Sequence, residues 1–140
     1  MPGDAREPFL NTRFRVEIDG LPRAAVIEVV FPEARIVSGR GKAGRIQHGA
    51  LTLRRAMTAS SDWYRWWDSA RRSARTAQKQ VIVVLIDRSE AEVCRWTFAG
   101  ARPAAYATSV LNALRSDLLI ETLELTVSGF RMNFAGSEEA

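Results

Sequence analysis

Hydrophobic and polar residues alternate in several short stretches of the chain, and a period of two is typical of a strand with one buried face. In RFRVEID (residues 13–19) apolar residues alternate with charged ones, and the Asp19-Gly20 pair marks a turn. LELTVS (residues 123–128) shows the same alternation near the C-terminus. Each of these segments is therefore predicted to form a half-buried strand.

A second group of segments has strand composition without alternation. AAVIEVVF (residues 24–31) is apolar on both faces except at Glu28, and Pro32 follows it. A strand with two apolar faces is typical of one covered on both sides, so this segment is predicted to be a central strand that ends at the proline. ALTLRRAM (residues 50–57) is a further predicted strand.

The strongest strand signal is QVIVVLI (residues 80–86), and EVCRWTF (residues 92–98) is predicted to pair with it in a hairpin through the polar residues 87–91. Two stretches lack a clear pattern. Residues 103–118 fit either a short helix or an irregular connection, and Gly39–Arg45 is predicted to be a flexible or partner-ordered loop.

Only Ser61 to about Lys79 has apolar residues at the three- and four-residue spacing of a helix. Ser60 or Ser61 suits its N-cap, and Asp62 suits its first turn. The predicted buried stripe consists of Trp63, Trp66, Trp67, Ala70, Ala74 and Ala77. Three tryptophans in line with alanines favour a helix that packs its aromatic end into the core.

The composition predicts one ordered domain over residues 1–140, with residues 1–10 and 132–140 as flexible or subunit-contacting ends. The chain has 140 residues, of which 46% are hydrophobic and 26% charged, close to the averages for soluble globular proteins. No apolar run approaches the roughly 20 residues that span a bilayer, and no secretory signal is apparent at the N-terminus. Synthesis in the cytoplasm without a membrane partner is the expectation.

Candidates for covalent or metal chemistry are weak. GRGKAG (residues 39–44) has the spacing of a dinucleotide-binding loop, but the segment after it resembles a strand instead of the helix that would receive a phosphate. His48 and Cys94 are the only histidine and cysteine, so neither a catalytic triad nor a cysteine metal cluster is indicated. Cys94 is predicted to be a buried thiol. We therefore expect no enzyme activity, no metal and no cofactor.

Charge is distributed unevenly along the chain. Residues 1–80 carry a net charge of +7, whereas residues 81–140 carry −3. Such a division fits either an acidic ligand for the basic part, or two oppositely charged surfaces that attract each other between copies of the chain. The arginine-rich helix leaves a nucleic-acid-binding module as an alternative function, but base stacking would require its tryptophans to be exposed.

An ordered set of motifs resembles the tail tube proteins of contractile phage tails and extracellular contractile injection systems. FRVEIDG (residues 14–20) comes first, LTLRR (residues 51–55) then leads into a tryptophan-rich helix, and IETLELTVSGF (residues 120–130) comes last. The resemblance extends over residues 11–131. It implies a mainly β (α+β) fold, an antiparallel β-sandwich or half-barrel with one flanking helix, whose sheets join between subunits into a ring barrel.

The resemblance also implies a function. Such proteins form stacked hexameric rings that build a conduit inside a contractile sheath, as part of a phage tail or phage-tail-like particle. The implied partners are further copies of the chain, sheath and baseplate proteins, and a nucleic acid or protein cargo in the lumen. A tube-initiating or tube-terminating homologue at the baseplate or cap is the alternative role. The candidate subunit-interface residues are Arg40, Lys42, Arg45, Arg71, Arg75, Glu121 and Glu124.

Overall fold

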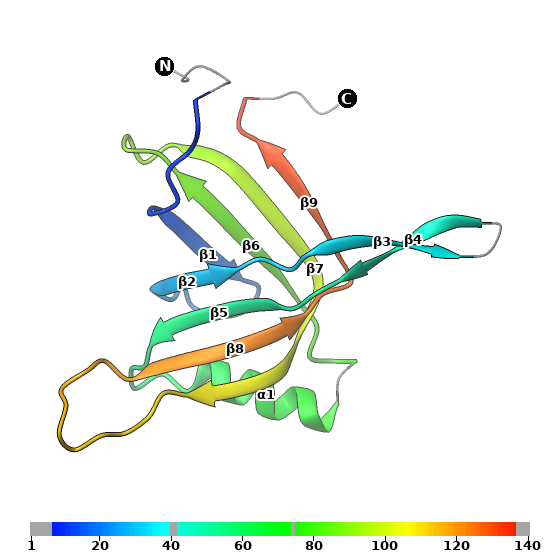
Figure 1. Ribbon diagram of the computed structural model, residues 1–140. Helices are drawn as coiled ribbons and strands as arrows, with labels where there is room; N and C mark the ends of the chain where they lie inside the picture. The colour runs from blue at the N-terminus through cyan, green and yellow to red at the C-terminus, as the bar shows by residue number, and fades with distance from the viewer. Residues whose placement is uncertain (1–6, 40–41, 74, 137–140) are drawn as a thin grey trace.

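A computed structural model describes residues 7–39, 42–73 and 75–136. Within them the chain forms nine strands and one helix (Figure 1). In chain order these are β1 (Phe14–Ile18), β2 (Val26–Val30), β3 (Ala34–Gly39), β4 (Lys42–His48), β5 (Leu51–Ala56), α1 (Asp62–Arg72), β6 (Lys79–Ile86), β7 (Glu92–Thr108), β8 (Ile120–Thr126) and β9 (Gly129–Phe134).

The strands form two antiparallel sheets that share β7. One sheet, called sheet A, contains β1, β6, the first part of β7 and β9. The other, called sheet B, runs in the order β7, β8, β5, β2 and uses the second part of β7. β3 and β4 pair only with each other and form a separate hairpin. The predicted mainly β architecture with one flanking helix is confirmed.

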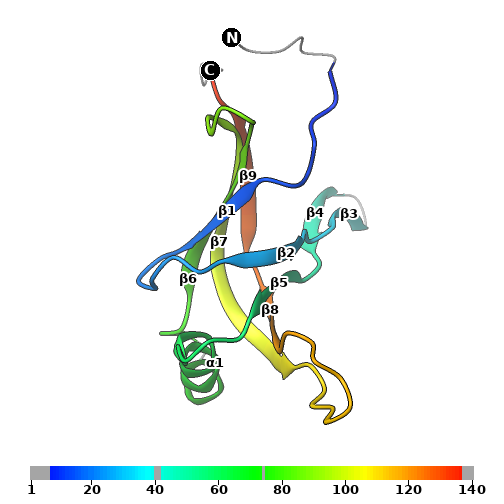
Figure 2. The same cartoon turned by 90° about the vertical axis from the view of Figure 1, so that its left-hand side faces the viewer.

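β7 passes from sheet A to sheet B through a bend at Gly100. This residue has φ +60, a conformation that residues with a Cβ rarely adopt. It lies between Ala99, which pairs with β9, and Arg102, which pairs with β8. Strands that change sheet need such a bend, because the two sheets run in different directions. Figure 2 shows the resulting curve of β7 from one sheet into the other.

The core lies between the two sheets and α1. Val16 and Val83 from sheet A meet Leu53 and Leu123 from sheet B in one buried cluster. Trp63 completes it from the helix and has no exposed surface. The alternating segments at residues 13–19 and 123–128 therefore bury the predicted faces, and Cys94 is buried as expected.

The helix is shorter than its pattern predicts, ending at Arg72 instead of about Lys79. Its C-cap, Ser73, is extended, and the chain then turns back so that the Ala77 carbonyl accepts a hydrogen bond from Trp66 Nε1 at 2.6 Å. Ala77 is buried in the core, although it lies outside the helix. Spacing alone could not separate these cases, because a returning segment can bury the same alanine. No helix in the described residues is long and apolar enough to cross a membrane.

The predicted central strand at residues 24–31 is instead an edge strand. β2 pairs with β5 on one side, and no described strand lies on its other side. Ile27 and Val30 are 54% and 49% exposed. The prediction of a central strand was wrong for the single chain. Apolar residues on both faces of a strand do not require a neighbouring strand of the same chain on each side.

Three other segments differ from or extend the sequence reading. The segment predicted as a loop at Gly39–Arg45 belongs largely to the β3–β4 hairpin, in which Ile36 is opposite Ile46. Residues 103–108 belong to β7, and residues 109–119 form an irregular connection without a helix. β9 reaches Phe134, so the first residues of the predicted C-terminal end lie in sheet A. The predicted hairpin between residues 80–86 and 92–98 is confirmed.

Candidate assembly surfaces

Sheet B presents one face to the core and one face of small and polar residues away from it. Register places Glu28, Arg54, Thr122 and Ala107 in one row across four strands. Arg54 Nη1 donates to Glu28 Oε1 at 3.0 Å, which joins β5 to β2. The outward set is Glu28, Val30, Thr52, Arg54, Ala56, Arg102, Ala105, Ala107, Ile120, Thr122, Glu124 and Thr126. This face is hydrophilic and contains both signs of charge.

The same sheet ends in two open edges within the described part of the chain. β2 has a partner only in β5, and the Arg102–Thr108 part of β7 has a partner only in β8. Open edges expose unpaired backbone donors and acceptors, which favour pairing with another chain. The two edges lie on opposite sides of sheet B (Figure 1).

Beneath the core face of sheet B, a buried ionic cluster fixes α1 to the strands. Arg55 from β5 donates to Asp62 at the start of α1, and its Nε donates to Glu121 Oε1 of β8 at 2.6 Å. The Tyr106 hydroxyl donates to the other oxygen of Glu121. The Arg55 guanidinium also lies 4.1 Å from the centre of the Trp63 ring. Arg55, Asp62 and Glu121 are 4%, 6% and 1% exposed.

The cluster changes the proton affinities of its members. Burial alone would raise the pKa of Asp62, but the hydrogen bonds from Arg55, Ser60 and the Trp63 N–H, together with the charge of Arg55, outweigh it and lower that pKa. Burial would lower the pKa of Arg55, yet its bonds to the two carboxylates raise it. Burial and the bond to Glu121 raise the pKa of Tyr106 to about 12. The charged guanidinium is therefore the member that stabilises the others, and the cluster acts as a structural tie.

The predicted N-cap takes a different form. Ser61 occupies the cap position but makes no side-chain cap bond. Asp62 Oδ1 instead accepts from the Trp63 backbone N–H at 2.9 Å, while also binding Arg55. The carboxylate thus satisfies one free N–H group of the first turn and anchors the helix to β5.

The predicted interface residues fall into three groups. Arg40 lies outside the described residues, and only the backbone of Lys42 is described. The exposed members are Arg45, Arg71, Arg75 and Glu124. The prediction of Glu121 as an interface residue was wrong, because its side chain is enclosed by Arg55 and Tyr106 and is not available to another subunit. The structure does not bring the exposed members together at one site, and Arg71 is paired with Asp68 at 2.7 Å.

The tryptophans do not form a stacking surface. Trp63 and Trp66 are 0% and 3% exposed, which confirms them as core residues. Trp67 is half-buried and packs near the rings of Tyr64 and Tyr106. Base stacking through the helix is therefore contradicted, because its largest aromatic faces are inside the protein.

Sequence reasoning missed one surface, the connection between β7 and β8. Residues 109–119 expose four large apolar side chains. The members are Val110, Leu111, Leu114 and Leu118. The leucines of SVLNALRSDLL are visible in the sequence, where they fit either a short helix or an irregular connection. Only the structure shows that these four side chains stay exposed in the described chain.

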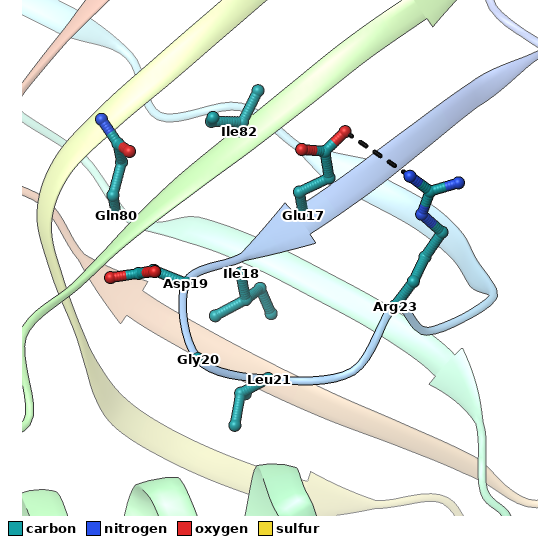
Figure 3. Close-up of a pocket in the computed structure, with 8 residues that line it drawn as sticks. All are labelled: Glu17, Ile18, Asp19, Gly20, Leu21, Arg23, Gln80 and Ile82. Carbon is teal, nitrogen blue, oxygen red and sulfur yellow. Dashed lines mark ion pairs between the residues drawn. The ribbon is translucent and has the colours of Figure 1, made fainter.

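The grooves of the surface are shallow and polar. Figure 3 shows one beside the β1–β2 turn, with a volume of about 350 Å³, where Glu17 pairs with Arg23 at 3.9 Å. No group of metal-binding side chains occurs among the described residues. His48 packs edge-on against Phe130, with ring centroids 5.8 Å apart. None of these features assembles a nucleophile with a base.

Solved structures share this fold over nearly the whole chain. A chain in the anti-feeding prophage (AFP) baseplate has 22% identity and a TM-score of 0.72, with 94% of this chain and 99% of that chain covered. A chain in the sheath-tube complex of the PVC extracellular contractile injection system has 15% identity and a TM-score of 0.75, with coverage of 94% and 95%. Hcp1 from Flavobacterium johnsoniae has 16% identity and a TM-score of 0.63, with coverage of 87% and 95%.

The sequence comparisons are more specific about the family. No curated protein matches the sequence significantly. The model of the family described as T4-like virus tail tube protein gp19 matches residues 10–131, which include every strand except the end of β9. The polar outer face, the open edges and this match agree, and the chain belongs to the T4-like tail tube protein family.

Proposed function

We propose that the chain is a structural subunit of the inner tube of a contractile injection system, and that copies join edge to edge into hexameric rings. The observation that carries the proposal is the pair of open edges of sheet B. Neighbouring strands in the order β2, β5, β8, β7 are all antiparallel, so β2 and β7 run in opposite directions. Placing β7 of one copy beside β2 of the next continues the antiparallel pattern and removes both edges.

The composition of β2 supports this joint. Ile27 and Val30 are half exposed in the single chain, although β2 has the two apolar faces of a covered strand. A neighbouring strand beside β2 would pair the open backbone edge of β2 and would flank the side chains of Ile27 and Val30. The wrong prediction of a central strand is thereby explained, because β2 becomes an interior strand of the ring. The AFP baseplate that contains a similar chain is sixfold symmetrised, which supports six copies.

The lumen is lined by the outer face of sheet B. Closing the sheet into a barrel places one face outside and one inside, and the α1 side is already occupied by the core. The inner face then consists mainly of threonines and alanines, with the Glu28–Arg54 pair and the further charges Arg102 and Glu124. Because its charges are mixed in sign, either a nucleic acid or a protein cargo can pass without strong retention.

The mechanism is geometric. A rigid tube transmits the force of a contracting sheath, and the chain supplies stiffness and a channel without making or breaking a covalent bond. Sheath and baseplate proteins are the proposed partners, in a phage tail or phage-tail-like particle assembled from cytoplasmic protein. Similar chains also occur in the AFP baseplate and in the AFP tube-terminating cap, so a role at one end of the tube is the second candidate.

The lateral joint is tested with Ile27→Asp, compared with Ile27→Val as a matched control. Ile27 is 54% exposed, so a charge there should leave the core of the chain intact. We expect sixfold rings for the wild type and the valine variant, and monomers with an unchanged thermal midpoint for the aspartate variant. Class-averaged electron microscopy and light scattering give the result. Rings of normal size from Ile27→Asp would contradict the β2–β7 joint.

A further inference from the structure

The connection between β7 and β8, residues 109–119, is the most apolar exposed segment of the described chain. Val110, Leu111, Leu114 and Leu118 are 88%, 85%, 94% and 73% exposed. Isolated exposed leucines need no explanation, but four large apolar side chains exposed within eleven residues are a local concentration of the kind that marks an interaction site. We call residues 109–119 the apolar loop.

The apolar loop has a defined conformation. At its base the Ser109 backbone N–H donates to the Ile120 carbonyl at 2.8 Å, and the Ile120 N–H donates to Ser109 Oγ at 2.8 Å. At its tip the Asn112 side-chain oxygen accepts from the Leu114 N–H at 2.9 Å. These bonds present the leucines to the outside without burying them. A preorganised loop loses little conformational entropy when a partner covers it.

A complementary surface lies at the other end of sheet B. Ile36 and Ile46 are opposite each other in the β3–β4 hairpin and are 70% and 54% exposed. Phe31, between β2 and β3, is 43% exposed. Figure 1 shows the apolar loop and the hairpin at opposite ends of the strands of sheet B. Each chain thus has one apolar projection and one apolar receiving surface, facing in opposite directions.

This placement identifies the partner as a second copy of the chain. Joining through the edges of β2 and β7 extends the ring sideways, so the ends of the strands point toward the rings above and below. A contact between two different surfaces of identical chains repeats without closing on itself, which is the symmetry of a stack. We propose that the apolar loop of each copy docks on Phe31, Ile36 and Ile46 of a copy in the next ring; this inference rests on the proposed function.

The area is sufficient for such a contact. A leucine side chain carries on the order of 100 Å² of apolar surface, so the four exposed side chains offer roughly 300 Å². Counting both partners, one contact removes roughly 600 Å² from water, and six contacts between two rings remove roughly 3,600 Å². One contact alone is below the size of a stable interface, whereas six together exceed it. Docking should therefore occur between assembled rings and not between monomers.

The test separates ring formation from stacking. Leu114 is replaced by aspartate, and Leu114→Met serves as the matched apolar control. Because Leu114 is 94% exposed, neither change should affect folding. We expect single rings from Leu114→Asp and stacked tubes from the wild type and Leu114→Met, with at least a tenfold loss of stacked particles in class-averaged micrographs. Stacks of normal length from Leu114→Asp would overturn the inference, whereas a monomeric wild type would overturn the proposed function.

A crosslinking experiment tests the identity of the two surfaces. Leu114→Cys and Ile36→Cys chains are mixed in equal amounts, assembled and treated with a bis-maleimide crosslinker. Cys94 is buried and should not react with the crosslinker. Wild-type chains treated in the same way are the control for this assumption. We expect covalent dimers only in the mixture. Dimers from Leu114→Cys alone would indicate a contact between two apolar loops and would overturn the proposed pairing. Tubes assembled from the mixture without crosslinked dimers would overturn it as well.

Discussion

Replacing Arg55 by methionine is expected to destabilise the chain far more than neutralising either of its acidic partners. Arg55 is the only cation in a buried cluster with two carboxylates, Asp62 and Glu121. Methionine keeps most of the apolar stem but removes the charge and its hydrogen bonds. Two buried acidic groups are then left without a partner.

The magnitude follows from the geometry. Removing one partner of a buried ion pair costs about 3–5 kcal/mol, because it leaves an uncompensated charge. The guanidinium 4.1 Å from the Trp63 ring adds about 1 kcal/mol or more. By contrast, Glu121→Gln leaves the ion pair between Arg55 and Asp62, whose charges cancel, and an amide oxygen that still accepts a hydrogen bond. The free energy of unfolding should fall by about 1 kcal/mol. At roughly 3 °C per kcal/mol, the thermal midpoint should fall by about 12–18 °C for Arg55→Met and about 3 °C for Glu121→Gln.

The dependence on pH gives a second signature. In the wild type the lowered pKa of Asp62 contributes stability above its usual value of 3.8, and this stability is lost as the pH falls through the lowered pKa. Without Arg55, Asp62 loses its hydrogen bond and its charge partner, so burial, the largest single effect, should raise the pKa of Asp62. Protonation of Asp62 then removes the unpaired buried charge of the variant as the pH falls. The difference in thermal midpoint between the wild type and Arg55→Met, measured by circular dichroism, should therefore be smaller at pH 4 than at pH 7. A loss below about 1 kcal/mol at pH 7, or a gap independent of pH, would refute the reasoning.

Three further predictions concern the fold. Gly100→Ala should cost about 2 kcal/mol or more in urea unfolding, because a Cβ there lies 2.5 Å from Ser128 Oγ at a positive φ; Ala99→Gly, next to the bend, is the comparison, and an equal effect would be contrary evidence. Trp66→Phe should lower the free energy of unfolding by about 1–3 kcal/mol, since it leaves the Ala77 carbonyl without the indole N–H 2.6 Å away; an unchanged melting midpoint would contradict this. In a variant whose other tyrosine is phenylalanine, absorbance at high pH should show Tyr106 ionising near 12, and stability should fall as the pH rises above its ordinary 10, because the folded state holds the proton longer; a midpoint near 10 would exclude the buried bond to Glu121.

Local patterns predicted most of the secondary structure, and their errors have physical causes. The alternation at residues 13–19 predicted β1 because a strand's two faces are visible in its own sequence. The same reasoning misplaced β2, whose second apolar face is exposed in the single chain. The glycine-rich, basic segment from Gly39 resembled a loop, but its pairing with β3 depends on the preceding strand and not on its own composition.

The candidate surfaces were less predictable than the elements. Glu121 looked like a surface charge, since a carboxylate in an alternating strand is usually solvated, and its burial depends on an arginine 66 residues away. The leucines of residues 109–119 fitted either a short helix or an irregular connection, and their spacing did not show that they would be exposed. Arg45 and Glu124 remain surface candidates, as their exposure allows.

The sequence by itself determined six of the nine described strands, the aromatic face of α1 and the family, because periodicity and ordered motifs are properties of neighbouring residues. Only the tertiary structure decided which strands lie at the edges of sheet B and which charges meet in the core. Both depend on pairings between residues far apart in the chain, and the register of those pairings is set by the fold as a whole.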